Sequence, residues 1–294
     1  MKILFLSTGG PTQDYLRDCV FHGLRSLLGS DVVDAGKLDS MYVGADRTRM
    51  YGRGFTLYAM LPDIEVDRTD IPKKISKKYF DIVIYGSIHR CQDYLAEVAS
   101  MYQAPQCVFL DGEDHPGYLS GLGGLTFKRE LYNPQPGCLP IQFGIPKEKI
   151  LPSPLDKEEI LAPCDPINKK TYIYSTEEEY YFQYAKSYFG ATMKKAGWDC
   201  LRHYEILSQW CLPYFRCFEQ LPPTIAQFLP RKELRLAQLA FEYYRGREWE
   251  VDTLISLWRD LIHPCMKIMH EHLTTEAVAR YVLDKIGVRE TACT

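Results

Sequence analysis

Short apolar runs alternate with amphipathic segments through the first half of the chain, and this alternation constrains the fold more than any other feature. Residues 2–7 form an apolar run that ends in Ser-Thr-Gly-Gly-Pro, and similar runs occupy residues 81–86 and 106–112. Uninterrupted apolar runs are typical of strands buried on both faces of a parallel sheet. Between the first two runs, residues 14–28 carry apolar side chains at helical spacing before Gly29. Strands that alternate with helices predict a doubly wound α/β sheet.

The same patterns continue beyond a proline-rich stretch between residues 134 and 170, which predicts a domain boundary. We expect further short strands at four places, namely residues 32–33, 171–174, 189–192 and 211–215. We expect further helices over residues 71–80, 94–101, 177–188, 199–209 and most of 231–288.

Composition and charge exclude several classes of protein. The 294-residue chain has a formal net charge of −3, which provides no overall attraction to nucleic acid or to an anionic membrane. No apolar run approaches the roughly 18 residues of a membrane-spanning helix. The ten cysteines include no CxxC pair, and the N-terminal apolar run is too short for the core of a signal peptide. We therefore expect a cytoplasmic protein with reduced cysteines, no membrane span and no structural zinc site.

Ligands of doubly wound sheets bind beyond the carboxyl ends of the strands, so the loops after the predicted strands are candidate sites. After the first strand, Gly9 and Gly10 allow a ligand to approach the backbone at the start of a helix. An ordinary turn explains these glycines equally well. After the strand at residues 81–86, His89 and Arg90 are placed to contact a substrate or a phosphate, and a surface loop would look the same.

The loop after the strand at residues 106–112 gathers three carboxylates and an imidazole in the sequence Asp-Gly-Glu-Asp-His. Such a group is costly to hold together unless it faces solvent, a cation or a substrate. Glu113, Asp114 and His115 are therefore candidate general bases, and His89 is a further one. An exposed acidic turn is the alternative interpretation.

Positive charge follows this loop in the run Lys-Arg-Glu, of which Arg129 is the central residue, near a glycine-rich stretch. We interpret Arg129 as a candidate phosphate contact; a solvated run of charges is the alternative.

The strongest candidate segment is KKAGWDCLRHYEIL at residues 194–207. A helix that begins near Asp199 places Lys194 and Lys195 in the preceding loop, where their charges and the helix dipole together predict an anion site.

Arg202 and Glu205 lie three residues apart on this helix and therefore share one face. A carboxylate at Glu205 can accept hydrogen bonds from the two hydroxyls of a ribose while nearby cations hold a diphosphate. Trp198 adjoins the same ligand in this interpretation. The alternative is a core that includes Trp198 and a surface ion pair between Arg202 and Glu205.

The stretch KKAGWDCLRHYEILSQWCLPYF, residues 194–215, resembles the nucleotide-sugar-binding helix of GT-B-fold glycosyltransferases. In many of these enzymes a glutamate on a helix, followed by a Pro-containing strand, contacts the donor ribose. Glu205 followed by Leu-Pro-Tyr-Phe at residues 212–215 matches that order. The run GWDCLRHYE is similar to one in a subgroup of bacterial and viral glycosyltransferase-like proteins. Residues 126–146 resemble the segment that leads into the second GT-B domain.

The resemblance implies two Rossmann-like domains that face each other across a cleft, with a helical C-terminal segment. It implies an acceptor-side domain at residues 1–145 and a nucleotide-sugar-binding domain at residues 146–294. The expected donor is a nucleotide-diphosphate sugar, with UDP as the expected nucleotide, and no other cofactor is expected. The candidate donor-binding residues are Gly9, Gly10, Arg129, Lys194, Lys195, Trp198, Arg202 and Glu205.

The predicted reaction moves a sugar from this donor to an acceptor hydroxyl, and cations at the helix start replace the metal ion that other glycosyltransferases use. The acceptor is a glycan, a small molecule or a hydroxymethylated base in viral DNA. Two alternatives come from other classes. One is a nucleotide-binding or scaffold protein of the same fold without catalysis. The other is a metal-dependent hydrolase that uses Asp111, Glu113 and Asp114, which no suitably spaced pair of histidines supports.

Overall fold

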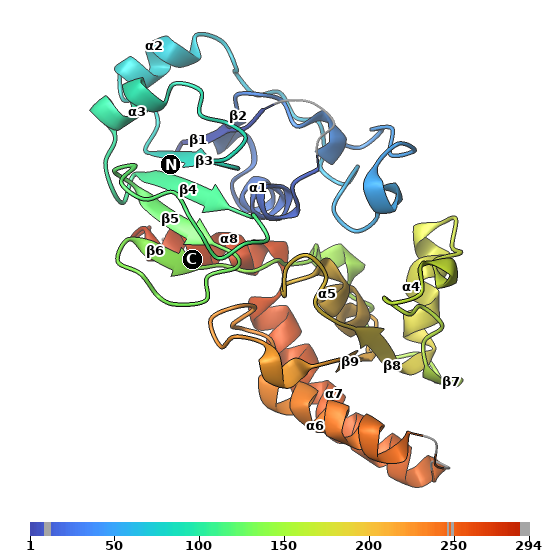
Figure 1. Cartoon of the computed structure of the whole chain (residues 1–294). Coiled ribbons are helices and arrows are strands. Elements are labelled where there is room, and N and C mark those ends of the chain that lie inside the picture. The colour runs from blue at the N-terminus through green and yellow to red at the C-terminus, as the bar shows by residue number, and fades with distance from the viewer. Residues whose placement is uncertain (9–12, 246, 248–249, 289–294) are drawn as a thin grey trace, which may run out of the picture.

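A computed structural model of the chain describes residues 1–8, 13–245, 247 and 250–288, and shows an α/β fold (Figure 1). Its larger sheet has six parallel strands in the order β2-β1-β3-β4-β5-β6. The bounds are β1 (Ile3–Leu6), β2 (Val32–Asp34), β3 (Ile82–Tyr85), β4 (Cys107–Asp111), β5 (Leu125–Lys128) and β6 (Cys138–Pro140). Because β2 and β3 flank β1 on opposite sides, the strand order reverses at β1. That reversal is where ligands bind in open α/β sheets.

Helices cover both faces of this sheet, as the uninterrupted apolar strands require. Ile3 and Phe5 of β1 belong to the core shared with α1 (Tyr15–Leu28), while Leu4 and Leu6 pack in a second core with α2 (Ile71–Ser76) and α3 (Leu95–Met101). Successive side chains of a strand point to opposite faces, so one apolar strand supplies both cores. The helix α1 begins where the Asp14 side chain accepts a hydrogen bond from the Arg17 backbone N–H.

The smaller sheet has three parallel strands, β7 (Glu159–Leu161), β8 (Ser187–Thr192) and β9 (Leu212–Phe215). The helices that come after β7 in the chain are α4 (Glu177–Ala185), α5 (Leu201–Ser208), α6 (Arg231–Tyr244), α7 (Val251–His272) and α8 (Thr275–Lys285). In Figure 1, α6 and α7 run side by side, and α6 packs against β9. The strand predicted at residues 171–174 is wrong: a 3-10 turn occupies Lys169–Thr171, and the Asn168 side chain caps it. The first strand of this sheet is instead β7.

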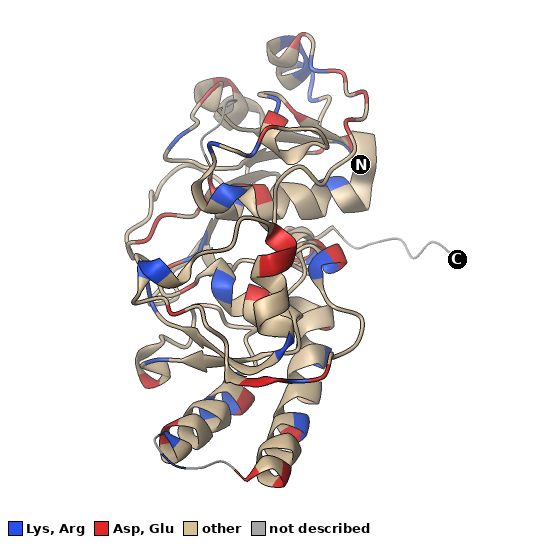
Figure 2. Ribbon diagram, turned by 90° about the vertical axis from the view of Figure 1, so that its right-hand side faces the viewer, with Lys and Arg blue, Asp and Glu red and all other residues tan. Residues whose placement is uncertain are grey.

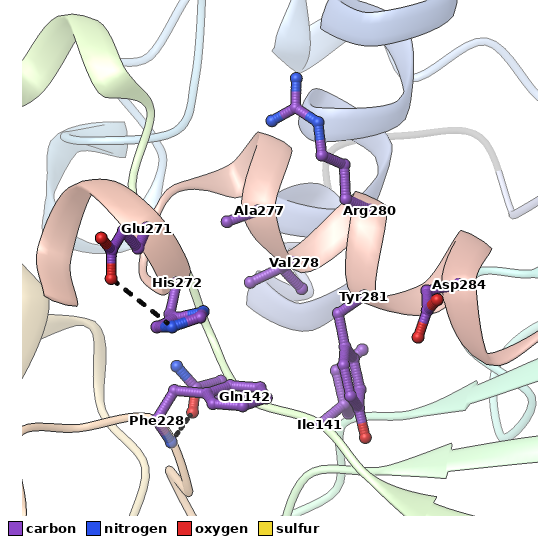
Figure 3. Close-up of a pocket in the computed structure, with 10 residues that line it drawn as sticks. All are labelled: Ile141, Gln142, Phe228, Glu271, His272, Ala277, Val278, Arg280, Tyr281 and Asp284. Carbon is purple, nitrogen blue, oxygen red and sulfur yellow. Dashed lines mark hydrogen bonds and ion pairs between the residues drawn. The ribbon is translucent and has the colours of Figure 1, made fainter. Parts of the chain in front are cut away.

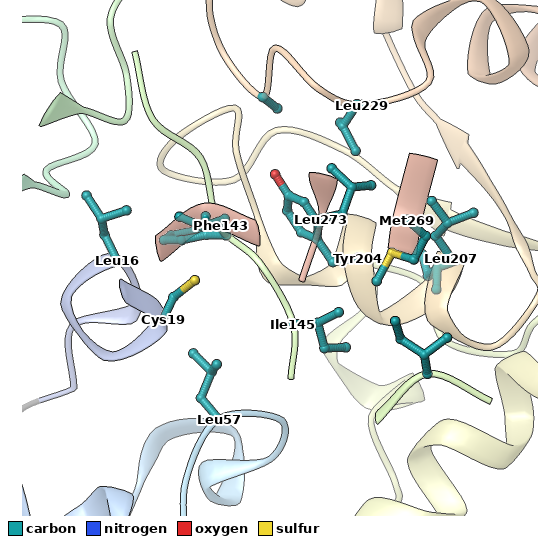
Figure 4. Packing of buried hydrophobic residues seen from close by; sticks show 14 of the residues in the cluster. Leu16, Cys19, Leu57, Phe143, Ile145, Tyr204, Leu207, Leu229, Met269 and Leu273 are labelled. Atoms are coloured by element: carbon teal, nitrogen blue, oxygen red, sulfur yellow. The ribbon is translucent and has the colours of Figure 1, made fainter. Parts of the chain in front are cut away.

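The end of the chain returns to the larger sheet, because α8 packs against α1 (Figure 1). A Cβ atom at Gly23 would lie 2.0 Å from the Thr275 carbonyl oxygen, so only glycine permits this approach of the two backbones. The molecule has two halves, one built on the larger sheet and one on the smaller sheet, and one continuous apolar cluster joins them. Figure 4 shows side chains from α1, α5 and α7 around Phe143 and Ile145 in this cluster.

Charged positions of both signs are interspersed along the ribbon (Figure 2). The helices of the described chain include none with the length and hydropathy of a bilayer-crossing segment. The cysteines within the described ranges are all free thiols.

Two buried histidines predict how stability changes with pH. Burial lowers the pKa of His22 and of His203 from 6.5 to about 4. His203 is fully buried, and its two ring nitrogens lie 2.8 Å from Thr192 Oγ1 and 2.8 Å from the Trp198 carbonyl oxygen. Between these pKa values the unfolded chain binds protons that the folded chain does not, so each histidine makes the protein less stable as the pH falls.

We expect His203→Gln to reduce this pH dependence by about 1.4 kcal/mol of unfolding free energy per pH unit between about pH 6 and pH 5. Urea unfolding at a series of pH values measures it. His270→Gln, at an exposed position on α7, is the control and should keep the slope of the unaltered protein. An unchanged slope in His203→Gln would show that His203 does not titrate as its burial predicts.

Candidate functional site

The carboxyl ends of β3, β4 and β5 bring together His89, Asp111 and Lys128. Asp111 and Lys128 are fully buried, and Lys128 Nζ donates a hydrogen bond of 2.8 Å to Asp111 Oδ1. The other carboxylate oxygen, Asp111 Oδ2, lies 2.9 Å from His89 Nε2. The His89 side chain is 25% exposed, so the imidazole is accessible while its carboxylate partner is not.

This arrangement orients the imidazole of His89. Asp111 accepts a hydrogen bond from His89 when Nε2 carries the proton, which leaves Nδ1 as the basic nitrogen of the neutral ring. Among the described residues, Nδ1 has no hydrogen-bond partner. A histidine held by a buried carboxylate is the arrangement that general bases require.

The three other predicted bases lie together in the loop after β4, and each has a different partner. Glu113 Oε1 forms an ion pair with Arg90 Nη2 at 3.2 Å, and Asp114 forms an ion pair with Arg129 Nη2. The ring of His115 meets the ring of His89 edge-on, with 6.0 Å between the centroids. Both carboxylates are thus engaged with arginine, whereas His89 is held by a carboxylate.

Arg129 connects this loop to the start of α5. Its side chain is 2% exposed and donates to the carbonyl oxygens of Gly112 (3.1 Å) and Asp199 (2.7 Å), as well as to the carboxylates of Glu130 (2.8 Å) and Asp114. Burial alone would lower the pKa of Arg129, but the neighbouring carboxylates of Asp199, Glu130 and Asp114 raise it. A phosphate contact by Arg129 remains a prediction; the observed bonds of this residue hold the two halves of the molecule together.

Asp199, just before α5, is the residue that meets Arg129 from the half built on the smaller sheet. Its Oδ2 accepts a hydrogen bond of 2.8 Å from the backbone N–H of Phe143, and its Oδ1 accepts one of 2.8 Å from Tyr204. Burial raises the pKa of Asp199 to about 6, against the lowering effect of Arg129 and of these hydrogen bonds. The backbone N–H of Asp199 donates to Glu130 Oε1 at 3.0 Å, so both halves contribute to one buried network.

Gly197 allows this contact between the two halves. A Cβ atom there would lie 2.6 Å from Arg129 Nη1, 2.6 Å from Glu130 Oε1 and 2.8 Å from Asp114 Oδ1. The acidic loop and the loop before α5 therefore meet at a position where any larger residue would displace the ends of these three side chains from their hydrogen bonds.

We predict that Gly197→Ala destabilises the protein by about 1–3 kcal/mol, the usual cost of forcing an extra methyl group into a packed site. The matched control is Gly117→Ala, whose Cβ would lie 3.4 Å from His115 Nδ1, an ordinary van der Waals contact. Urea unfolding of both variants provides the comparison. Equal stability of Gly197→Ala and the unaltered protein would mean that the two loops separate without cost.

The structure places the predicted cations around the start of α5, where the helix begins at Leu201 rather than Asp199. Lys194 Nζ lies 5.1 Å above the ring of Trp198, which is buried. Lys195 is exposed, and its ammonium group donates to the Pro166 carbonyl oxygen. Phosphate contacts by these side chains stay predictions.

Arg202 is the most buried cation of this group. Its guanidinium lies 5.4 Å from the ring centroid of Tyr172. Its Nε and Nη1 atoms are buried and have no hydrogen-bond partner in the described part of the chain. Because a buried donor without a partner costs free energy, an anion that accepts from these atoms would be bound favourably.

Glu205 is buried on the same helix and already accepts two hydrogen bonds. Its Oε1 accepts from Thr56 Oγ1 at 2.6 Å and its Oε2 accepts from Tyr180 at 2.7 Å. Burial raises its pKa, against the lowering effect of these two hydrogen bonds. Neither the surface ion pair nor a free carboxylate describes this residue, and its contact with a ribose stays a prediction.

The sequence patterns do not predict that residues 42–59, which we call the bridging segment, belong to the site. This segment of the larger sheet's half lies beside α4 in Figure 1, and Arg47 pairs with Glu177 at 3.3 Å. Thr56 has a φ of 80°, which is rare for a β-branched residue. Its N–H donates to Glu177 Oε1 at 2.6 Å, and these contacts hold the backbone in this conformation. The glycines at 44, 52 and 54 are the local signs of unusual turns in this segment.

A polar pocket of about 350 Å³ lies at the ends of β1 and β2, where the strand order reverses. Ser7 and Thr8 line it after β1, Gly36 after β2, and Arg68 and Tyr94 from the segments that precede α2 and α3. The predicted contacts at Gly9 and Gly10 lie outside the described residues.

Within the described ranges, no group of three or more His, Cys, Asp or Glu side chains is arranged to hold a metal ion. Comparisons of the sequence with protein-family models and with curated proteins find no match.

Proposed function

We propose that the protein is a glycosyltransferase of the GT-B type that transfers a sugar from a nucleotide-diphosphate sugar to an acceptor hydroxyl. The proposal includes the finer description of the fold, in which residues 1–145 form the acceptor-side domain and residues 146–294 the donor-side domain. The observation that carries it is the contact through Arg129 between the start of α5 and the loop after β4, which holds Asp114 and His115 and lies beside His89.

The donor would bind at the start of α5 in this proposal. Arg202 offers two unpartnered donor atoms, and Lys194 and Lys195 add positive charge in the preceding loop. Together with the helix dipole, these groups would stabilise the diphosphate as it leaves. The UDP-sugars are the expected donors, and Glu205 is the candidate partner of the ribose hydroxyls.

His89 would act as the base that accepts the proton of the acceptor hydroxyl. Asp111 orients the ring and would stabilise the imidazolium that forms, as the carboxylate does in Ser-His-Asp triads. Glu113, Asp114 and His115 remain candidates, but each carboxylate has an arginine partner, and among the described contacts Asp111 accepts no hydrogen bond from the side chains of these three residues. A base in this position corresponds to a reaction that inverts the configuration of the sugar.

A second candidate is a nucleotide-binding or scaffold protein of the same fold without catalysis. One observation favours it: both oxygens of Glu205 accept hydrogen bonds inside the protein, and Arg129 makes four hydrogen bonds there. Residues with such tasks stabilise the fold without any ligand.

Release of the nucleoside diphosphate distinguishes the two candidates. The protein is incubated with UDP-glucose, UDP-galactose, UDP-N-acetylglucosamine or GDP-mannose and a mixture of simple sugar acceptors, with and without EDTA. We expect release from at least one donor, in EDTA as well, because protein cations neutralise the diphosphate. Binding without release would support the second candidate, and release that needs added Mg²⁺ or Mn²⁺ would overturn the metal-independent mechanism.

A further inference from the structure

A second pocket, of about 300 Å³, lies where the end of α7, the start of α8 and the chain after β6 meet (Figure 3). None of its lining residues belongs to the cluster around His89 or to the start of α5. The residues around it are Ile141, Gln142, Phe228, Glu271, His272, Ala277, Val278, Arg280, Tyr281 and Asp284.

The walls of this pocket are apolar and aromatic. Ile141, Ala277 and Val278 contribute aliphatic surface. The rings of Phe228 and Tyr281 meet edge-on with 5.4 Å between their centroids, and the ring of His272 stacks on Phe228 at 5.2 Å, so three rings line one side of the pocket. Tyr281 is anchored by a hydrogen bond of 2.8 Å from its hydroxyl to the Pro140 carbonyl oxygen, so the wall is preformed. A ligand with an apolar face fits such walls.

Gln142 places a hydrogen-bond donor in the pocket. This side chain is 1% exposed, and its Oε1 accepts a hydrogen bond of 2.9 Å from the backbone N–H of Phe228. Because a backbone N–H can only donate, the oxygen must face Phe228 and the amide nitrogen must point away from it. In Figure 3 this nitrogen lies on the side of His272. It is buried without a hydrogen-bond partner in the described chain, so an acceptor group on a ligand would satisfy it.

The rim combines donors and acceptors of hydrogen bonds. Glu271 and Asp284 are exposed carboxylates and therefore accept, whereas the amide nitrogen of Gln142 donates. A hydroxyl group both donates and accepts, so a ring with several hydroxyls can satisfy such a rim at many points. Glu271 and Asp284 each have a lysine neighbour, Lys267 at 4.0 Å and Lys285 at 3.7 Å, so these four charges balance and leave no excess positive charge for a phosphate.

We propose that this pocket binds the ring of a neutral sugar, with its apolar C–H face against Val278, Phe228 and Tyr281 and its hydroxyls on Gln142, Glu271 and Asp284. The proposal does not depend on the glycosyltransferase function, because the site binds a free sugar without a nucleotide and without transfer.

Saturation-transfer NMR with the full chain tests the proposal, with D-glucose, D-galactose and N-acetylglucosamine as probes and indole as an apolar comparison. We expect transfer to at least one sugar. Ala277→Phe fills the pocket from α8 and should abolish it, and Asp284→Asn, at an exposed position, should weaken binding about tenfold, as the loss of one hydrogen bond to a charged group does.

The matched controls are Ala240→Phe and Asp260→Asn, which change the same residue types on α6 and α7 outside the pocket and should leave sugar binding unchanged. Thermal unfolding confirms that each variant is folded; if Ala277→Phe is not, Asp284→Asn decides. Three results would overturn the proposal: no transfer to any sugar, sugar binding that survives both pocket variants, or an Ala277-dependent signal from indole alone.

Discussion

Replacing His89 by glutamine is expected to lower the rate of sugar transfer by about 10²–10⁴-fold, the usual contribution of a general base. The glutamine amide can still donate to Asp111, so the buried carboxylate keeps a partner, but the side chain no longer accepts a proton. Donor affinity should stay the same, because proton transfer matters only in the transition state. Turnover and donor binding are measured separately for this reason.

His270→Gln is the control for this experiment, since His270 is exposed on α7 far along the chain from the site. Near-normal turnover of His89→Gln would remove His89 as the base and return the role to Glu113, Asp114 or His115. An equal loss of donor affinity and of turnover would instead indicate a binding role.

Lys128→Met is expected to reduce the free energy of unfolding by about 3–5 kcal/mol, the cost of breaking a buried ion pair. Lys128 is fully buried and donates to Asp111 Oδ1 at 2.8 Å and to the Glu113 carbonyl oxygen at 2.9 Å. Without Lys128 the buried charge of Asp111 keeps only His89 and the backbone N–H of Glu113 as partners. Urea unfolding measures the loss.

Lys73→Met, on the exposed surface of α2, is the control and should change stability by less than about 0.5 kcal/mol. The double variant Lys128→Met with Asp111→Leu removes both charges and should recover part of the stability, because an apolar pair of similar volume avoids the cost of desolvation. A double variant no more stable than Lys128→Met would show that the pair does not act as a unit.

The buried strands could be predicted from the sequence because their burial is continuous and their side chains are apolar. Three strands could not, namely β5, β6 and the exposed β7. In β5 the polar residues Thr126 and Lys128 interrupt the pattern, and Lys128 is buried only because Asp111 from β4 neutralises it. The strand β6 has three residues and ends at Pro140. Such strands depend on their neighbours in the sheet, which a local pattern does not contain.

The wrong strand at residues 171–174 has a similar cause. Its aromatic and β-branched residues favour a strand, but the Asn168 cap and the contact of the Tyr172 ring with Arg202 determine a turn instead. Tertiary contacts outweigh local propensity here.

The candidate site was predicted in part, for the same physical reason. The loops after the strands hold the reactive groups, and their convergence follows from the parallel topology. The partners of each group depend on distant residues: Asp111 finds Lys128, Arg129 finds Asp199, and Glu205 finds Thr56. Thr56 belongs to no motif, so only the fold places the bridging segment at this site.

Calorimetric titration of nucleotide sugars into the protein and into Arg202→Met tests the central claim most directly. Arg202, on the helix proposed to hold the diphosphate, has two buried donor atoms that find no partner among the described residues, and methionine keeps most of its apolar volume. Arg235→Met, on α6 and away from that helix, is the matched control. We predict that at least one of the UDP-sugars or GDP-mannose binds the unaltered protein and the control, and that Arg202→Met binds it at least about tenfold more weakly. Absence of binding by every nucleotide sugar, or equal affinity in Arg202→Met, would contradict the account.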